Sequence, residues 1–101
     1  MNRPIEKITS SVLLKTAVSM LRAVAHPLRI KLLTFIEKHE PVNVNVIYRE
    51  LQLDQSVASQ HLKILRDQQL VCTTRKGKYI FYSLNREKLK RILEAVYDFT
   101  G

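Results

Sequence analysis

The sequence predicts a mainly helical domain that carries a two-stranded β-hairpin. Apolar residues recur at helical spacing along most of the 101 residues, and two strand-like runs near the C-terminal end flank Lys76-Gly77, whose glycine suits a hairpin turn. Only two glycines and three prolines are present, which is too few for a flexible linker. We therefore expect one domain over residues 1–101.

Two helices separated by a proline are predicted first. Over residues 10–24, apolar side chains form a helical stripe that is wider than one core needs. Pro27 suits the first turn of a second helix over residues 28–38, and Pro41 ends that helix. The spacing allows two inward faces for the second helix, made of Ile30, Leu33 and Ile36 or of Leu32 and Phe35.

A helix, a tight turn and another helix follow. Residues 44–51 are expected to form the first of these helices, and Asp54 is placed to cap the start of the second, over residues 55–69. Apolar residues at positions i, i+4 and i+7 give the second helix one buried face, which consists of Ala58, Leu62 and Leu65.

Two strands and a last helix complete the chain. The strands are expected over residues 71–74 and 79–84, and Gly77 can take the positive φ that their hairpin needs. Asn85 is placed to cap a helix over residues 86–99, whose apolar residues again cover more than one face. Because the first and last helices both carry spare apolar surface, we expect a homodimer that forms through them.

The charge balance favours a polyanionic partner. Seventeen Lys and Arg against nine Asp and Glu give a formal net charge of +8, which attracts polyanions through a salt-screened field. Residues 41–70 carry three basic and three acidic side chains, whereas residues 71–84 carry three basic side chains and no acidic one. We therefore expect sequence reading and charge-based binding to be separated along the chain.

The outer arc of the helix at 55–69 carries hydrogen-bonding side chains with little net charge. Glutamine can bind an adenine through two hydrogen bonds, and small serine residues let a helix lie deep in the major groove of DNA. An ordinary solvated helix face would carry the same residues. If the arc reads DNA, we expect base contacts from Gln55, Ser59 and Gln60, and phosphate contacts from Ser56 and Lys63.

The hairpin tip carries three cations, Arg75, Lys76 and Lys78. Basic residues at such tips also protect edge strands against aggregation, so the tip alone is not diagnostic. Directly after a helix-turn-helix, however, these side chains can straddle the DNA backbone, and one of them can enter the minor groove. The two elements together indicate a winged helix-turn-helix that binds double-stranded DNA.

Four segments carry a family resemblance: residues 25–30 (AHPLRI), residues 53–66 (LDQSVASQHLKILR), Leu70-Val71, and residues 75–78 (RKGK) leading to Tyr82. Over about residues 17–84 the chain resembles the bacterial ArsR/SmtB family of dimeric winged-helix repressors. It departs at Val57-Ala58, where the family more often has the larger apolar residue second.

The resemblance implies five helices, a two-stranded wing, a dimer formed by the first and last helices, and an operator with inverted-repeat symmetry. Two recognition helices would then lie about 34 to 36 Å apart, one turn of DNA.

The metal-sensing residues of that family have no counterpart in this chain. Many relatives bind soft metals through a Cys-x-Cys pair, which falls here on Asn43 and Asn45; amides are poor ligands for such metals, and we expect capping or loop roles for them. Other relatives bind zinc on the last helix through an Asp-x-His pair, but this helix begins Arg86-Glu87-Lys88 and has no histidine. We expect no metal and no cofactor, and the sequence identifies no effector.

The scattered histidines and the single cysteine are expected to have structural roles. His26 is expected to cap its helix, His39 to favour a helix C-terminus, and His61 either to pack beside the core or to touch a DNA phosphate. Cys72 has no second cysteine for an internal disulfide, and we expect a buried structural residue rather than a redox sensor.

The leading interpretation is a DNA-binding transcriptional regulator, expected to be a cytoplasmic repressor. No nucleophile elbow, glycine-rich phosphate loop or pair of carboxylates beside a base is present, so we do not expect an enzyme. Lys15 interrupts the apolar run near the N-terminus, so neither a signal peptide nor a membrane span is expected. The alternatives are a winged-helix protein-interaction module and a DNA-binding regulator that senses no effector.

Overall fold

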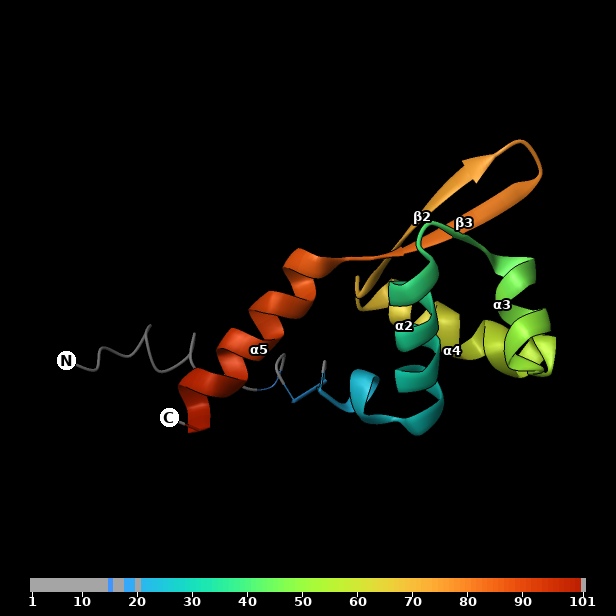
Figure 1. The fold of residues 1–101 in the computed structure, drawn as a ribbon. Helices are drawn as coiled ribbons and strands as arrows, with labels where there is room; N and C mark the ends of the chain where they lie inside the picture. Colours follow the sequence, from blue (N-terminus) through green and yellow to red (C-terminus); the bar gives the residue numbers. More distant parts are fainter. Residues whose placement is uncertain (1–14, 16–17, 20, 101) are drawn as a thin grey trace.

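A computed structural model describes Lys15, residues 18–19 and residues 21–100 of the chain. Residues 15, 18–19 and 21–25 are helical, and the other positions of the first predicted helix lie outside the described residues. The elements that follow in chain order are α2 (Pro27–His39), β1 (Val42–Asn43), α3 (Val44–Leu51), α4 (Gln55–Asp67), β2 (Val71–Lys76), β3 (Tyr79–Leu84) and α5 (Arg86–Thr100), as Figure 1 shows.

Each of these four helices begins at a capping side chain that accepts a backbone N–H which the helix leaves unpaired. Asp54 caps α4 as predicted, and α4 ends at Asp67, two residues earlier than expected. The acceptor and donor atoms are His26 Nδ1 with Leu28 N at 3.1 Å, Asn43 Oδ1 with Asn45 N at 2.9 Å, Asp54 Oδ1 with Ser56 N at 2.9 Å, and Asn85 Oδ1 with Lys88 N at 3.2 Å. The capping roles predicted for His26, Asn43, Asp54 and Asn85 are thus confirmed.

Helices α3 and α4 are each followed, within two residues, by a glutamine in the left-handed region. Gln52 has φ 51° and Gln69 has φ 59°. In both turns the next residue donates its N–H to the carbonyl five positions earlier, which is the Schellman arrangement. Glycine is the usual residue at this position, and a side chain there costs roughly 1 to 2 kcal/mol. The tight turn between α3 and α4 therefore forms without a glycine.

The sheet has three antiparallel strands in the order β1-β3-β2. The expectation of two strands was wrong, because Val42 and Asn43 pair with Tyr82 and Phe81 of β3. A strand of two residues between a proline and a helix is too short to show an alternating pattern in the sequence. Strand β2 also extends to Lys76, two residues beyond its predicted end, and Gly77 has the expected positive φ of 61° in the turn.

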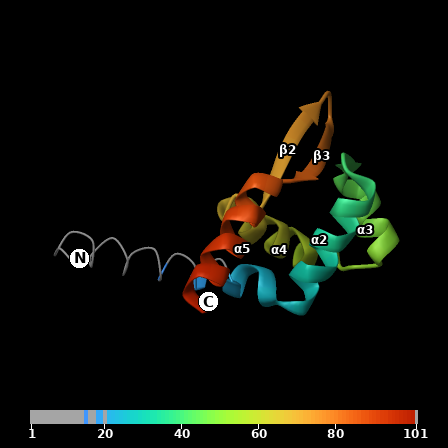
Figure 2. The ribbon, with the colours of Figure 1, turned by 60° about the vertical axis from the view of Figure 1, so that its left-hand side comes forward.

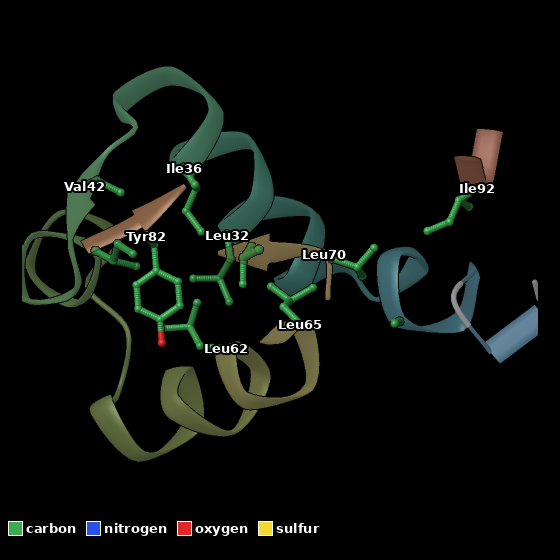
Figure 3. Close-up of a cluster of buried hydrophobic side chains, with 11 residues drawn as sticks. Leu32, Ile36, Val42, Leu62, Leu65, Leu70, Tyr82 and Ile92 are labelled. Carbon is green, nitrogen blue, oxygen red and sulfur yellow. The ribbon is translucent and has the colours of Figure 1, made fainter. Parts of the chain in front are cut away.

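The core lies between α2, α3, α4 and the sheet. Figure 3 shows Leu32, Leu62, Leu65 and Tyr82 converging in its centre, while Ile92 of α5 lies apart from them. The largest fully buried side chains are Leu32, Ile36, Ile47, Leu62, Leu65 and Leu70. Helix α2 uses Leu32 and Ile36 as its inward face, so each predicted face was partly wrong, and Ile30 is 49% exposed.

The wing, which we define as β2, β3 and their turn, and helix α5 leave the helical core in different directions. Figures 1 and 2 show the tip of the wing on the side of α3, and α5 on the opposite side. Glu40, the residue after α2, contacts both the end of β3 and the start of α5. Its Oε1 accepts a hydrogen bond from the Leu84 N–H at 2.9 Å, and its Oε2 forms an ion pair with Arg86. The Leu84 N–H and the Arg86 guanidinium lower the pKa of Glu40.

Candidate nucleic-acid interface

The start of α4 is fixed by Asp54. Its Oδ1 accepts the N–H groups of Ser56 and Val57 at 2.9 and 3.3 Å and the Ser56 hydroxyl at 2.5 Å. The bond from the Ser56 hydroxyl, together with the two backbone bonds, lowers the pKa of Asp54. The carboxylate therefore stays ionised and holds the first turn in place, and the Ser56 hydroxyl is directed back toward Asp54.

Helix α4 presents its polar arc to solvent. Its opposite arc is buried at the three positions predicted from spacing, Ala58, Leu62 and Leu65. The small Ala58 fills the core position, and Val57 beside it is 42% exposed. Within the described part of the chain, the side-chain amides of Gln55 and Gln60 have no hydrogen-bond partner, so both side chains are available to a ligand. The exposed polar residues of this arc are Gln55, Ser56, Ser59, Gln60 and Lys63.

Besides Ser56, two residues of the arc contact other side chains. The Ser59 hydroxyl lies 3.2 Å from the hydroxyl of Tyr48, a residue of α3 that the sequence analysis did not single out. Lys63 Nζ donates to Asp67 Oδ2 at 2.8 Å, one helical turn further along α4. Such an exposed pair contributes only about 0.3 to 0.5 kcal/mol, so a phosphate can replace Asp67 as the partner of Lys63 at little cost.

His61 differs from the rest of the arc because it faces α2. Its Nδ1 accepts a hydrogen bond from Arg29 Nε at 3.2 Å, and its ring centroid lies 4.6 Å from that of His26. Burial lowers the pKa of His61, and the neighbouring His26 and Arg29 lower it further. Of the two roles that the sequence left open for His61, this geometry favours packing between α4 and α2.

The wing presents its cations to solvent. Arg75, Lys76 and Lys78 are exposed, and none of the three forms an ion pair within the described residues. The ammonium groups of Lys76 and Lys78 lie 5.8 and 5.4 Å from the ring centroids of Phe81 and Tyr79. At exposed sites these cation–π contacts contribute only about 0.5 to 1 kcal/mol each, so the charges remain available to an anion.

Cys72 is exposed, so the expectation of a buried cysteine was wrong. Strand β2 lies at the edge of the sheet, and Val71 is its one buried residue. Cys72 follows Val71 along the strand, so it lies on the other face of the sheet, and its register partner there is Ser83 of β3.

The described residues contain no group of three or more His, Cys, Asp or Glu side chains placed to hold a metal ion. His39 lies at the end of α2 as predicted, where its Nδ1 lies 3.0 Å from the Phe35 carbonyl oxygen.

No helix in the described ranges has both the length and the apolar character needed to cross a bilayer.

The comparisons with known proteins agree on one family. The family model "Bacterial regulatory protein, arsR family" matches residues 26–73, which include α2, α3 and α4. The chain is 37% identical over 83 residues to the transcriptional repressor PagR of Bacillus anthracis, which covers 82% of this chain and 83% of PagR. It is 38% identical over 85 residues to the nodulation protein NolR of Rhizobium meliloti, covering 84% and 69% of the two chains. The crystal structure of NolR from Sinorhizobium fredii superposes with a TM-score of 0.71 at 31% identity, over 98% of this chain and 94% of that one.

Proposed function

Because this chain belongs to the ArsR family of bacterial regulatory proteins and is a DNA-binding transcriptional regulator, we propose that it represses transcription by binding an inverted-repeat operator as a homodimer. Its relatives are regulators rather than enzymes, which makes a catalytic role unfavourable. PagR, which is a transcriptional repressor, supports repression as the outcome. The proposed site of action is the cytoplasm, where residues 1–101 act as one domain.

In this proposal α4 lies in the major groove. Gln55, Ser59 and Gln60 contact base edges, and Ser56 and Lys63 contact phosphates and fix the register. The exposure of these five side chains supports the assignment, and within the described residues the side-chain amides of Gln55 and Gln60 have no hydrogen-bond partner. His61 packs α4 against α2 through its hydrogen bond with Arg29 and does not contact bases.

The wing supplies the sequence-independent part of the binding free energy. Arg75, Lys76 and Lys78 neutralise backbone phosphates beside the major groove that α4 occupies, and one of them enters the minor groove. The absence of acidic residues between positions 71 and 84 supports this role, because no carboxylate there repels DNA.

The homodimer forms through the helices at residues 10–24 and 86–99. The described part of these helices exposes large apolar side chains, among them Val18, Leu21 and Leu93. Such surface in a small domain is usually covered by another subunit. Two-fold symmetry then places the two α4 helices about 34 to 36 Å apart, one turn of DNA.

One observation carries the proposal. Figures 1 and 2 show α5 extending away from α3 and from the tip of the wing. The polar residues of α4 and the wing cations are exposed, and so are the apolar residues Leu93 and Tyr97 of α5. A dimer made through α5 would therefore leave both DNA-binding elements of each subunit accessible.

Selection of bound duplexes from a random pool tests the proposal directly. The expected result is an inverted repeat whose half-site centres are about 10 base pairs apart. A salt series on the selected duplex should give a log affinity that falls linearly with log salt concentration. Recovery of no enriched sequence, or an affinity independent of salt, would instead support a protein-interaction module.

A further inference from the structure

Tyr48 connects α3 to the DNA-reading arc of α4. Its ring is half-buried and packs against the hydrophobic core, while its hydroxyl reaches the Ser59 hydroxyl at 3.2 Å. Ser59 is exposed and is one of three residues proposed to contact base edges. A core-anchored aromatic residue thus touches a side chain of the proposed readout surface.

The backbone of Tyr48 is also held in place, by hydrogen bonds in the turn that follows α3. Its carbonyl accepts the N–H groups of Gln52 and Leu53, the latter at 3.3 Å, in the turn between α3 and α4. A tyrosine has only two side-chain torsions, so a fixed backbone and a packed ring leave its hydroxyl little freedom. The position of the Tyr48 oxygen relative to α4 is therefore set by the helix-turn-helix itself.

This contact determines what Ser59 can offer to DNA. A free serine hydroxyl rotates, and it can donate to one base or accept from another. The phenolic hydroxyl of a tyrosine is more acidic than an aliphatic hydroxyl, so it is the better donor of the two. When Tyr48 donates to Ser59, the serine proton is free to point toward the groove, and Ser59 becomes a donor.

We propose that Tyr48 is a positioning residue for operator recognition, which holds the Ser59 hydroxyl as a donor to a purine N7 in the major groove. Both purines present N7 as an acceptor there, so this contact selects a purine at one position of each half-site. The inference depends on the proposed function, because it assigns one step of sequence readout to a pair of residues in α3 and α4.

A double-mutant cycle on the selected operator and on a scrambled duplex tests the pair. Tyr48→Phe keeps the ring and removes the hydroxyl, and Ser59→Ala removes the acceptor. Each single variant should weaken operator binding about 3- to 10-fold, the range expected for one hydrogen bond, and leave the scrambled duplex unaffected. The double variant should bind like either single variant. Thr34→Val, which removes an exposed hydroxyl from α2, outside both proposed DNA-binding elements, serves as the control and should change neither affinity.

Replacing each operator purine by its 7-deaza analogue gives a readout that a merely structural role would not move. At one position, the 7-deaza analogue should lower the affinity of the wild-type protein for the operator. The same analogue should not lower the affinity of Tyr48→Phe or Ser59→Ala any further. This comparison remains valid if Tyr48→Phe lowers the melting temperature, since each protein is compared with itself on two duplexes.

Three results would overturn the inference: unchanged operator affinity in Tyr48→Phe, independent effects of the two substitutions, or equal weakening on the scrambled duplex, which would indicate a phosphate contact. A wild-type protein that selects no duplex at all would refute the proposed function instead, so the two failures are distinguishable.

Discussion

The two ends of the molecule expose opposite kinds of surface. Apart from Val57 and Tyr79, the end with α4 and the wing exposes mainly glutamines, serines and cations, which water solvates well. The end with α5 exposes Leu93 at 70% and Tyr97 at 74% of their surface. Covering one such large apolar side chain is worth roughly 1.5 to 3 kcal/mol. The comparison teaches that the end with α4 and the wing is solvated in a single chain, whereas the α5 end leaves apolar surface exposed, as the proposed dimer requires.

The largest effect is expected from a charge on α5. Leu93→Glu places a carboxylate on the apolar face, and burying it against a second subunit would cost more than the contact gains. We expect monomers in analytical ultracentrifugation and a loss of about 100-fold or more in operator affinity, because linked half-site binding is lost. Leu93→Met is the matched control and should remain dimeric. A Leu93→Glu dimer with unchanged affinity would show that the α5 end is not an interface.

A smaller effect is expected at α4. Gln60→Ala removes an exposed amide with no protein partner among the described residues, so stability should be unchanged. Operator affinity should fall by about 1 to 3 kcal/mol, while affinity for a scrambled duplex stays constant. Fluorescence anisotropy on both duplexes measures the two values. Equal losses on both would mean that α4 contacts only the backbone.

The wing should show the opposite pattern. Lys76→Ala and Lys78→Ala should each weaken binding to every duplex, by about the same factor, and lower the slope of log affinity against log salt by about one. Lys31→Ala, on the outer face of α2, controls for net charge alone and should leave the slope unchanged. A wing substitution that changed base preference would contradict the proposal that α4 recognises the bases while the wing binds only phosphates.

A pH effect is expected at the joint between α4 and α2. The unfolded chain protonates His61 near its ordinary pKa of about 6.5, whereas the pKa in the folded protein is lower. Between these two values the unfolded state binds more protons, so the free energy of unfolding should fall as pH drops below about 6.5, and stay constant above it.

Chemical denaturation across this pH range, with His61→Asn as the comparison, isolates the effect. Asparagine offers an acceptor to Arg29 but does not titrate, so its profile should lack that part of the decline. Identical profiles for the two proteins would assign the acid sensitivity to other groups.

Much of the helical framework could be predicted because its signals are local. Asp54 and Asn85 are placed to cap helices and do so, and the predicted bounds of α3 are those observed. The inward face of α4 followed from spacing alone, since one turn of a helix determines which neighbours share its face.

What the sequence did not predict depends on contacts between elements. The pairing of β1 with β3 joins residues about 40 positions apart, and nothing in two residues signals it. The contacts from Tyr48 to Ser59 and from Arg29 to His61 depend on the angles between helices, which periodicity does not specify. Cys72 was placed wrongly for a related reason: which face of an edge strand is covered depends on what packs over it.

The central strand β3 connects the other two strands of the sheet to α5. This strand holds β1 on one side and β2 on the other, and its last residue is bound by Glu40 immediately before α5 begins. The start of α5, the hairpin tip and, through β1, the first turn of α3 are therefore joined by one hydrogen-bonded strand. A shift of α5 would have to be absorbed within β3 or passed along it, since only Asn85 separates the two elements.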